Sequence, residues 1–240
     1  MVWGGSMLYS FEYMKDIQRS IRNIELEALK EKNILITGAA GLIGSALVDI
    51  LLYLNKKHGY RTQIYVAVRN LEKARLRFNS SWASDSLIYL YYDANKKIDF
   101  KVKPDYIIHA ASNAHPKVFG LEPVETMTAN TRGMYNIMEY AFLHNVKRVL
   151  YISSSEIYGK KTTDGLYNES DYGYIDLLSS RSCYPISKRA AETMCVSFLK
   201  EYGCDVVIVR PGHIYGPTQT KEDSRASAQF LREASERKDI

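Results

Sequence analysis

The sequence predicts an α/β fold in which helices cover both faces of a doubly wound parallel sheet. From Lys32 onward, short apolar segments alternate with longer segments of helical pattern, which is the order that builds such a sheet. The apolar segments are continuous rather than alternating, so their strands are expected to be buried on both faces. With 240 residues, 46% of them hydrophobic, the chain can bury one sizeable core.

One segment precedes this alternation. From Phe11 to Leu29 apolar residues recur at helical spacing with charged residues between them, which predicts an amphipathic helix. We expect residues 1–31 to form an N-terminal helical arm that packs on the domain that follows, rather than one that contacts another subunit. That domain spans residues 32–240. The opening "MVWGGS" is typical of a cloning remnant, with Met7 as the native start.

The remaining elements follow in chain order. We expect the helix of residues 41–54 to end near Gly59 and the helix of residues 185–202 to end at Gly203, because glycine favours the left-handed backbone that terminates helices. The segment 159–183 is the longest irregular stretch, and loops of that length are usually functional or disordered. The predicted strands are 33–37, 63–68, 86–92, 105–111, 148–153 and 205–210, and the other predicted helices are 70–78 and 124–145.

Charge and composition narrow the class of protein. The net charge of +5 suits anionic ligands such as phosphates, but the basic residues are dispersed, which argues against nucleic-acid binding. No apolar run approaches the roughly 18 residues that span a bilayer, so we expect no membrane partner. The first residues lack a basic region followed by an apolar one, so we expect no secretory signal. The three cysteines lack the spacing of metal ligands, so we expect no metal site and a cytoplasmic protein with free thiols.

A glycine motif follows the first predicted strand. "TGAAGLIG" places Gly38, Gly41 and Gly44 between that strand and the helix that follows. Glycines allow a tight turn and close approach to a pyrophosphate, and a helix N-terminus offers free N–H groups to the anion. The sequence therefore predicts a dinucleotide site, whereas the structural alternative is a turn that only packs helix against strand.

The ends of the next two strands bear on the cofactor. An acidic residue after the second strand would bind the ribose of NAD, but this chain has Arg69, which can pair with the 2′-phosphate of NADP or stack on adenine. NAD and NADP both stay open. Asp93 ends the third strand and is expected either to contact the adenine or to serve as a turn residue.

"YPISK" places Tyr184 and Lys188 four residues apart, one helical turn. Pro185 fits the first turn of a helix, which puts Tyr184 at its start. A tyrosine is a poor base at its ordinary pKa of about 10. A neighbouring ammonium and a cationic nicotinamide would lower the pKa of Tyr184 and favour the phenolate.

Together these motifs resemble the extended short-chain dehydrogenase/reductase family, in its nucleotide-sugar epimerase/dehydratase branch. The further matching segments are "IIHAAS" (107–112), "ISSSEIYG" (152–159) and "RPGHIYGP" (210–217), in family order from about residue 32 to 220. The resemblance implies a Rossmann-like domain that binds NAD or NADP, a nucleotide-sugar substrate and a homodimer. The dimer would form through the helices that follow the fourth and fifth strands.

The resemblance also implies residue roles. Tyr184 would be the catalytic base, Lys188 its partner, and Ser154 the hydroxyl that bonds the reacting sugar oxygen. His109 ends a strand and is expected to be a hydrogen-bonded structural histidine near the cofactor. The cofactor-binding residues implied are Gly38, Gly41, Leu42, Ile43, Gly44, Arg69, Asp93, Ala110, Ala111, Ser112, Asn130, Tyr184, Lys188 and Pro211.

Two departures from the family affect the substrate. The chain has His213 where the family often has asparagine, at a position expected near the sugar nucleotide. The family also continues beyond the point where this sequence stops, so we expect a truncated chain that lacks much of the substrate region.

The reaction implied starts with oxidation of a sugar hydroxyl, at C4, to a transient ketone. Ser155 and Glu156 follow Ser154, a pattern that resembles 4,6-dehydratases and uronate decarboxylases more than simple 4-epimerases. Glu156 would be a base or a substrate-orienting carboxylate, or else a solvent-facing glutamate, and Ser155 a hydrogen-bond donor. We expect a dehydratase or decarboxylase, with a 4-epimerase as the alternative. An NADP-linked carbonyl reductase and a non-catalytic NAD(P)-binding protein also stay open.

Overall fold

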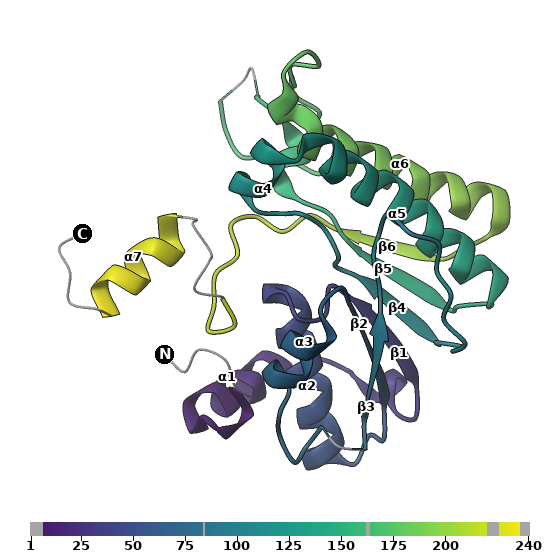
Figure 1. Ribbon diagram of the computed structural model, residues 1–240, viewed down its shortest axis with the longest axis vertical. Coiled ribbons are helices and arrows are strands. Elements are labelled where there is room, and N and C mark those ends of the chain that lie inside the picture. Colours follow the sequence, from purple (N-terminus) through teal and green to yellow (C-terminus); the bar gives the residue numbers. More distant parts are fainter. Residues whose placement is uncertain (1–6, 84, 162–163, 220–225, 236–240) are drawn as a thin grey trace. The chain divides into compact units, whose positions relative to one another are not determined.

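The computed structural model describes residues 7–83, 85–161, 164–219 and 226–235. The suggested cloning remnant therefore lies outside the described residues. Six strands form a sheet in the order β3-β2-β1-β4-β5-β6 (Figure 1). Every strand pairing with a printed register is parallel, which confirms the predicted α/β fold with a Rossmann-like sheet. The strands are β1 (Asn33–Thr37), β2 (Gln63–Val68), β3 (Leu87–Tyr91), β4 (Tyr106–His109), β5 (Arg148–Ile152) and β6 (Val206–Val209).

The helices match the sequence prediction in the middle of the chain and differ from it elsewhere. Helices α2 and α6 both end at a glycine in the left-handed conformation, Gly59 and Gly203, as predicted. Helices α4 and α7 were not expected. The helices are α1 (Phe11–Ile21), α2 (Leu42–His58), α3 (Leu71–Arg77), α4 (Pro116–Leu121), α5 (Pro123–Leu143), α6 (Cys183–Tyr202) and α7 (Ala226–Ser235).

The expectation of one long helix over residues 11–29 is wrong. Helix α1 ends at Ile21, and only a short 3-10 turn, η2 (Glu27–Leu29), follows. Ile24, which the pattern placed on the apolar face, is 58% exposed. The apolar spacing therefore did not mark a buried side chain at this position.

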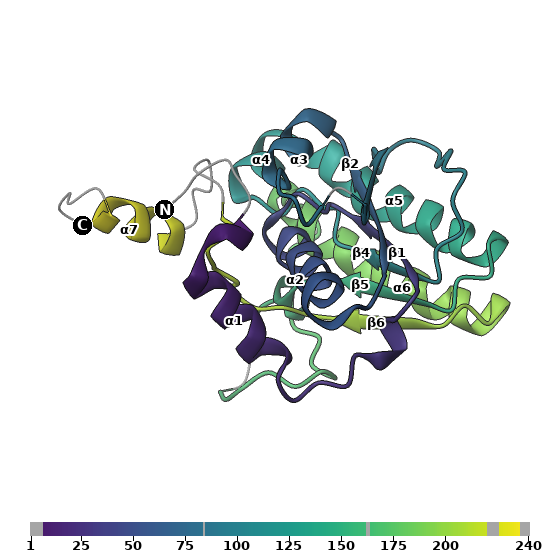
Figure 2. The same ribbon diagram turned by 90° about the horizontal axis from the view of Figure 1, so that it is seen from below.

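The chain divides into two compact units. The first comprises residues 1–92, 99–111 and 215–240, and it contains strands β1 to β4. Its core consists of strand residues such as Ile34, Ile36 and Val66 together with Leu52 of α2. Leu8, Tyr13 and Ile17 belong to the same core, so α1 packs on this unit as the sequence predicted; Figure 2 shows it beside α2.

The second unit comprises residues 93–98 and 112–214. It contains the pair β5 and β6, and helices α5 and α6 pack side by side along their length (Figure 1). Met134, Ile137 and Met138 of α5 are fully buried. Helix α6 also contacts the 3-10 turn η3 (Ser155–Tyr158), which follows β5 directly.

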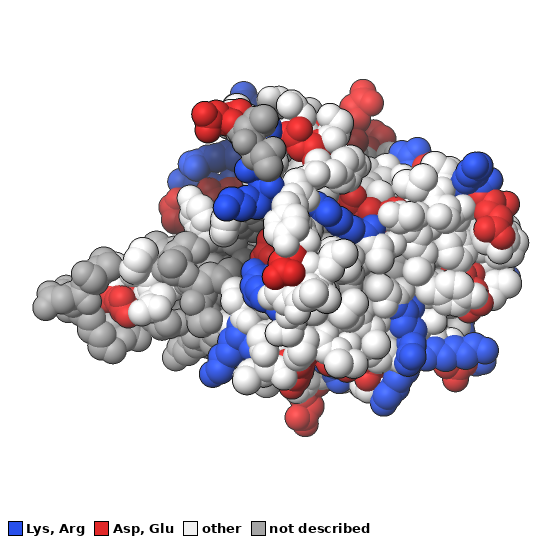
Figure 3. All heavy atoms as spheres, turned by 90° about the horizontal axis from the view of Figure 1, so that it is seen from above, with Lys and Arg blue, Asp and Glu red and all other residues white. Residues whose placement is uncertain are grey.

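The surface and the long helices carry two further observations. On the face shown in Figure 3, basic and acidic side chains are interspersed, without a broad area of one sign. Among the described residues, no helix is long and apolar enough to cross a membrane, and no cluster of three potential metal ligands occurs.

Candidate active site

The glycine motif forms the turn between β1 and α2 in the first unit. Gly38 has a φ of +65°, a left-handed conformation that glycine adopts without strain. A Cβ on Gly38 would lie 2.8 Å from the backbone of Ala110 and Ala111, and one on Gly44 would lie 2.4 Å from the carbonyl oxygen of Gly38. Any side chain at these two positions would therefore collide with backbone.

The start of α2 has the features of an anion site. Gly41 is the N-cap residue, so the first-turn N–H groups, including those of Leu42 and Ile43, have no partner within the helix. The first turn contains no acidic residue that would compete for these donors. A turn built of glycines that leads into free N–H groups fits the pyrophosphate of a dinucleotide.

The other predicted cofactor residues of the first unit lie just after the ends of β2 and β4. The backbone N–H of Ala110 donates to the Thr37 carbonyl oxygen at 3.2 Å, and that of Ala111 to Thr37 Oγ1 at 3.3 Å. His109 is 1% exposed, with Nδ1 2.7 Å from Thr37 Oγ1, so it is hydrogen-bonded in the core as expected. Arg69 lies exposed at the end of β2.

Asp93, Ser112, Asn130 and Pro211 belong to the second unit. The carboxylate of Asp93 accepts the backbone N–H of Asn95 at 3.0 Å and lies 3.9 Å from Lys96 Nζ, so it stabilises a turn. Asp93 therefore acts as a turn residue, which is one of the two roles that the sequence left open. Its contact with adenine remains a prediction.

Asn130 connects two helices of the second unit. It is 2% exposed; its Oδ1 accepts a bond from Ser112 Oγ at 2.8 Å, and its Nδ2 donates to Ser187 Oγ at 2.9 Å. The Ser187 hydroxyl in turn lies 2.6 Å from the carbonyl oxygen of Cys183 and 3.0 Å from that of Tyr184. This chain of bonds fixes the first turns of α6 relative to α5, and with them the position of Tyr184.

Tyr184 and Lys188 are both buried on α6, at 5% and 2% exposure. Lys188 Nζ lies 5.8 Å from the ring centroid of Tyr184 and 4.8 Å from that of Tyr151, and it donates to the Ile152 carbonyl oxygen at 2.8 Å. The helix begins at Cys183, two residues before Pro185, so Tyr184 occupies its first turn as predicted. The pair therefore lies against the end of β5.

Burial lowers the pKa of Lys188 to about 7, although the nearby Glu192 carboxylate acts in the opposite direction. Burial therefore opposes the charged form of this amine. The expected effect of its ammonium on Tyr184 therefore depends on groups that stabilise the charge of Lys188.

Glu192 anchors a buried polar network one turn further along α6. Its carboxylate accepts a short bond of 2.5 Å from Ser153 Oγ and a bond of 2.7 Å from Arg210 Nη2. Arg210 Nε also contacts both carboxylate oxygens, at 3.1 and 3.2 Å. The network joins the ends of β5 and β6 to α6. It binds the hydroxyl of Ser153 but not that of the adjacent Ser154.

Ser154 and Ser155 begin the turn η3. Ser154 is the N-cap residue, and its Oγ accepts the backbone N–H of Glu156 at 3.2 Å. A hydroxyl that accepts one bond still has its proton to donate to a ligand. Ser155 N donates to the Pro211 carbonyl oxygen at 2.9 Å, which holds the turn against the segment after β6.

Glu156 is half-buried and paired. Arg181 Nη2 donates to its Oε2 at 2.9 Å. The guanidinium carbon of Arg181 lies 4.4 Å from the ring centroid of Phe119, and Phe119 stacks on Tyr184 with centroids 5.1 Å apart. The glutamate thus belongs to a layered cluster that reaches the candidate catalytic tyrosine.

His213 lies exposed in the irregular segment after β6, and no contact places it near a ligand, so its substrate role remains a prediction. No role was predicted from the sequence for Arg181, Phe119, Glu192 or Arg210. Two signals could have found some of them: Glu192 lies four residues after Lys188, and Arg210 opens a matching segment at a strand end.

The comparisons with known proteins agree on a family. The NAD dependent epimerase/dehydratase family model matches residues 34–240. The UDP-glucuronic acid decarboxylase 1 of Danio rerio is 31% identical over 204 residues, which cover 85% of this chain and 46% of that protein. The namesake from Xenopus tropicalis is 29% identical over 236 residues, covering 93% and 53%. The chain spans about half the length of these curated relatives.

Solved structures share the fold. The UDP-glucose 4-epimerase of Thermotoga maritima, solved with UDP-glucose, superposes with a TM-score of 0.69 at 21% identity, covering 87% of this chain and 64% of that one. The dTDP-glucose 4,6-dehydratase DesIV of Streptomyces venezuelae, solved with NAD, gives 0.68 at 22% identity, covering 85% and 62%. Because the family model matches most of its length, the chain belongs to the NAD dependent epimerase/dehydratase family.

Proposed function

We propose that this chain carries the cofactor and catalytic groups of an NAD(P)-dependent nucleotide-sugar enzyme that acts through a transient 4-keto sugar. The carrying observation is the buried pair of Tyr184 and Lys188 at the end of β5, beside the turn that starts with Ser154. The expected reaction is decarboxylation of a nucleotide-linked uronic acid or 4,6-dehydration. The names of the curated relatives favour decarboxylation.

Each residue has a role in the first step. Ser154 donates a hydrogen bond to the C4 oxygen of the sugar, and Tyr184 accepts the proton of that hydroxyl. Lys188 in its ammonium form stabilises the phenolate of Tyr184 that accepts this proton. The dinucleotide, held by the turn of Gly38, Gly41 and Gly44, supplies the hydride acceptor when bound.

Glu156 and Ser155 distinguish the later steps. Glu156 would orient the substrate or abstract a proton, and Ser155 would donate a hydrogen bond. A serine lacks the acidity of an aspartate at this position, which weakens dehydration relative to decarboxylation. A 4-epimerase is the second candidate, because the core pair of Tyr184 and Lys188 would serve it equally well.

Product mass distinguishes the candidates. The protein is incubated with UDP-, dTDP-, GDP- and CDP-sugars, including UDP-glucuronic acid. Loss of carbon dioxide indicates decarboxylation, loss of water indicates dehydration, and an unchanged mass with altered retention indicates epimerisation. Stoichiometric consumption of reduced cofactor would support the carbonyl reductase instead. Cofactor binding without any product would support the non-catalytic protein.

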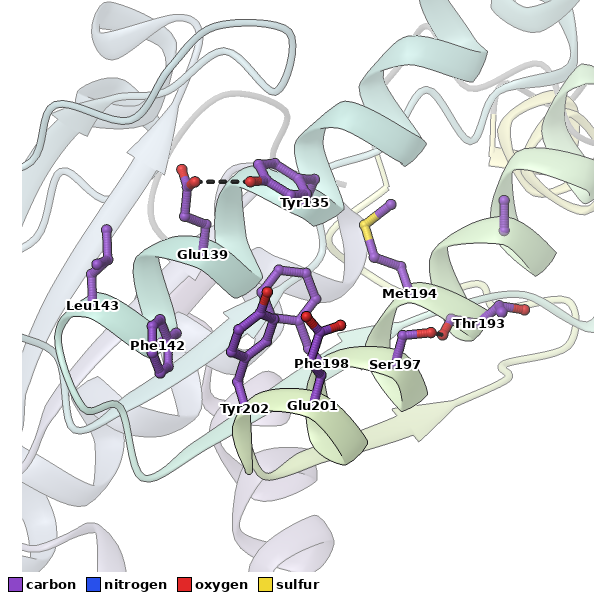
Figure 4. A pocket seen from close by; sticks show the side chains of 11 residues that line it. Tyr135, Glu139, Phe142, Leu143, Thr193, Met194, Ser197, Phe198, Glu201 and Tyr202 are labelled. Atoms are coloured by element: carbon purple, nitrogen blue, oxygen red, sulfur yellow. Dashed lines mark hydrogen bonds between the residues drawn. The ribbon is translucent and has the colours of Figure 1, made fainter.

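We further propose a homodimer through α5 and α6. A groove of about 530 Å³ runs between these helices (Figure 4). Its lining is mostly apolar and aromatic, and Phe142, Leu143, Phe198 and Tyr202 contribute to it. Leu143 is 65% exposed and Tyr202 46%. A second copy of the chain could pack its own α5 and α6 against this groove in a symmetric dimer. Such an isologous contact needs only one self-complementary patch.

Leu143→Glu would place a charge in this apolar surface. We expect it to shift the molar mass in light scattering from dimer towards monomer. Leu166→Glu, at a side chain that is 91% exposed on the loop after η3, is the matched control and should leave the mass unchanged. A wild-type protein that is monomeric at high concentration would contradict the dimer.

The three cysteines are free in the structure. Free thiols support the proposal that this protein works in the cytoplasm, since disulfides are rare there.

A further inference from the structure

Arg181 is a cation of the second unit to which no motif assigns a role. Its guanidinium stacks on Phe119, at 4.4 Å from the ring centroid. Phe119 stacks on Tyr184, with an interplanar angle of 18°. Guanidinium, phenyl and phenol therefore form three consecutive layers, and the carboxylate of Glu156 is bonded to the outermost one.

The stacking orients the guanidinium and leaves its donors accessible. A planar guanidinium over an aromatic face keeps its N–H groups at the edge, where they can meet a carboxylate in bidentate fashion. The bond to Glu156 engages only Nη2. The two side chains are 53% and 39% exposed. Ion pairs this exposed contribute only about 0–1 kcal/mol, so a better carboxylate can replace Glu156.

We propose that Arg181 binds the carboxylate of a uronic acid sugar, and that Glu156 holds that place in the free protein. The inference rests on the proposed function, because it requires Tyr184 to mark the position of the sugar C4. In a hexuronic acid the carboxylate is attached to C5, the neighbour of C4. Arg181 is joined to Tyr184 through Phe119 alone, which makes it the candidate cation for a carboxylate attached next to C4. The exchange would also release Glu156 for its role in the reaction.

A guanidinium also binds phosphate, and a nucleotide sugar carries a pyrophosphate. Two observations favour the carboxylate. The partner of Arg181 in the structure is itself a carboxylate, and the aromatic layers lead to Tyr184, the residue proposed to handle the sugar.

The test measures binding by calorimetry, in the presence of NAD, for UDP-glucuronic acid and for UDP-glucose, which has the same pyrophosphate and no carboxylate. Arg181→Gln is expected to weaken binding of UDP-glucuronic acid about tenfold or more, as for loss of a charge-assisted hydrogen bond. Its affinity for UDP-glucose should change less than about twofold, within the error expected for an untouched contact. Arg181→Lys should be intermediate, because lysine keeps the charge and loses the bidentate geometry.

Two further variants complete the design. Glu156→Gln removes the competing carboxylate and is expected to strengthen binding of UDP-glucuronic acid. Arg132→Gln removes an exposed positive charge of α5 that has no ion pair among the described residues, and it should leave both affinities unchanged.

Equal weakening of both ligands by Arg181→Gln would overturn the inference, since it would indicate a pyrophosphate contact or a structural role. Weaker binding of UDP-glucuronic acid to Glu156→Gln would overturn it as well. Product formation is followed separately. A product that forms without the affinity difference removes only the role of Arg181, and an affinity difference without any product removes only the proposed reaction.

Discussion

The glycine turn of the first unit and the polar cluster of the second unit are built by opposite means. The turn of Gly38, Gly41 and Gly44 is specified by the absence of side chains, because a Cβ on Gly38 or Gly44 would collide with backbone. The cluster around Glu192 and Lys188 is specified by buried side chains that bond to one another and to strand ends. A backbone-built site is sensitive to added atoms, whereas a side-chain-built site is sensitive to removed ones.

The largest effect is expected in the second unit. Glu192→Ala leaves the guanidinium of Arg210, which is 15% exposed, without its carboxylate. Breaking such a buried pair costs about 3–5 kcal/mol. The free energy of unfolding from chemical denaturation should fall by a comparable amount. Asp205→Ala, which breaks the exposed pair with Arg148, is the control, and about 1 kcal/mol or less should be lost there. Equal losses of unfolding free energy in the two variants would contradict the claim that buried side-chain bonds hold this cluster together.

The first unit should show the reverse sensitivity. Gly44→Ala adds one methyl group only 2.4 Å from the Gly38 carbonyl oxygen. Overpacking of this kind costs about 1–3 kcal/mol, and the displaced turn should weaken NAD(P) binding in a direct titration. Gly120→Ala in α4 is the matched control, because nothing lies within 4 Å of the added methyl group. Unaltered cofactor affinity in Gly44→Ala would contradict the claim that close backbone packing at this turn shapes the cofactor site.

The third effect concerns the pH dependence of stability. The folded-state pKa of Lys188 is about 7, below its usual value of 10.5. Between these values the unfolded chain binds a proton that the folded chain does not, so Lys188 makes stability rise with pH, by up to about 1.4 kcal/mol per pH unit. Below pH 7 the cost of burying the charge is complete.

Lys188→Met removes this titration. We expect the variant to gain stability over the wild type most at pH 6 to 7, and the gain to shrink as the pH rises towards 10.5. Denaturation curves of both proteins across this range provide the measurement. Parallel dependence in the two proteins would show that Lys188 keeps an ordinary pKa in the fold.

The same contrast explains what the sequence could predict. The glycine turn, the strand β1 and the helix ends at Gly59 and Gly203 follow from local residue patterns, because backbone conformation is constrained locally. The partners of Glu192 lie 39 and 18 residues away, and Arg181 reaches Glu156 across 25 residues. Such contacts depend on how α6 packs against the strand ends, which periodicity does not show. The end of α1 at Ile21 was missed for a related reason, since the pattern cannot tell which apolar residues find a core to pack on.

The distinction between the adjacent serines was available from the sequence only through the family resemblance. The structure engages Ser153 with Glu192 and leaves Ser154 at the start of the turn, with its proton available. The catalytic role of Ser154 remains a prediction.

The internal redox cycle driven by Tyr184 is tested most directly by following the hydrogen on the sugar C4. UDP-glucuronic acid deuterated at C4 is incubated with the wild type, with Tyr184→Phe and with Tyr174→Phe, a control at an exposed tyrosine. We expect a product that keeps its deuterium in the wild type and in the control. We expect a rate about 10²–10⁴ lower in Tyr184→Phe, as for loss of a general base. Wild-type turnover by Tyr184→Phe, or a product that has exchanged its deuterium for solvent hydrogen, would contradict an internal redox cycle driven by Tyr184.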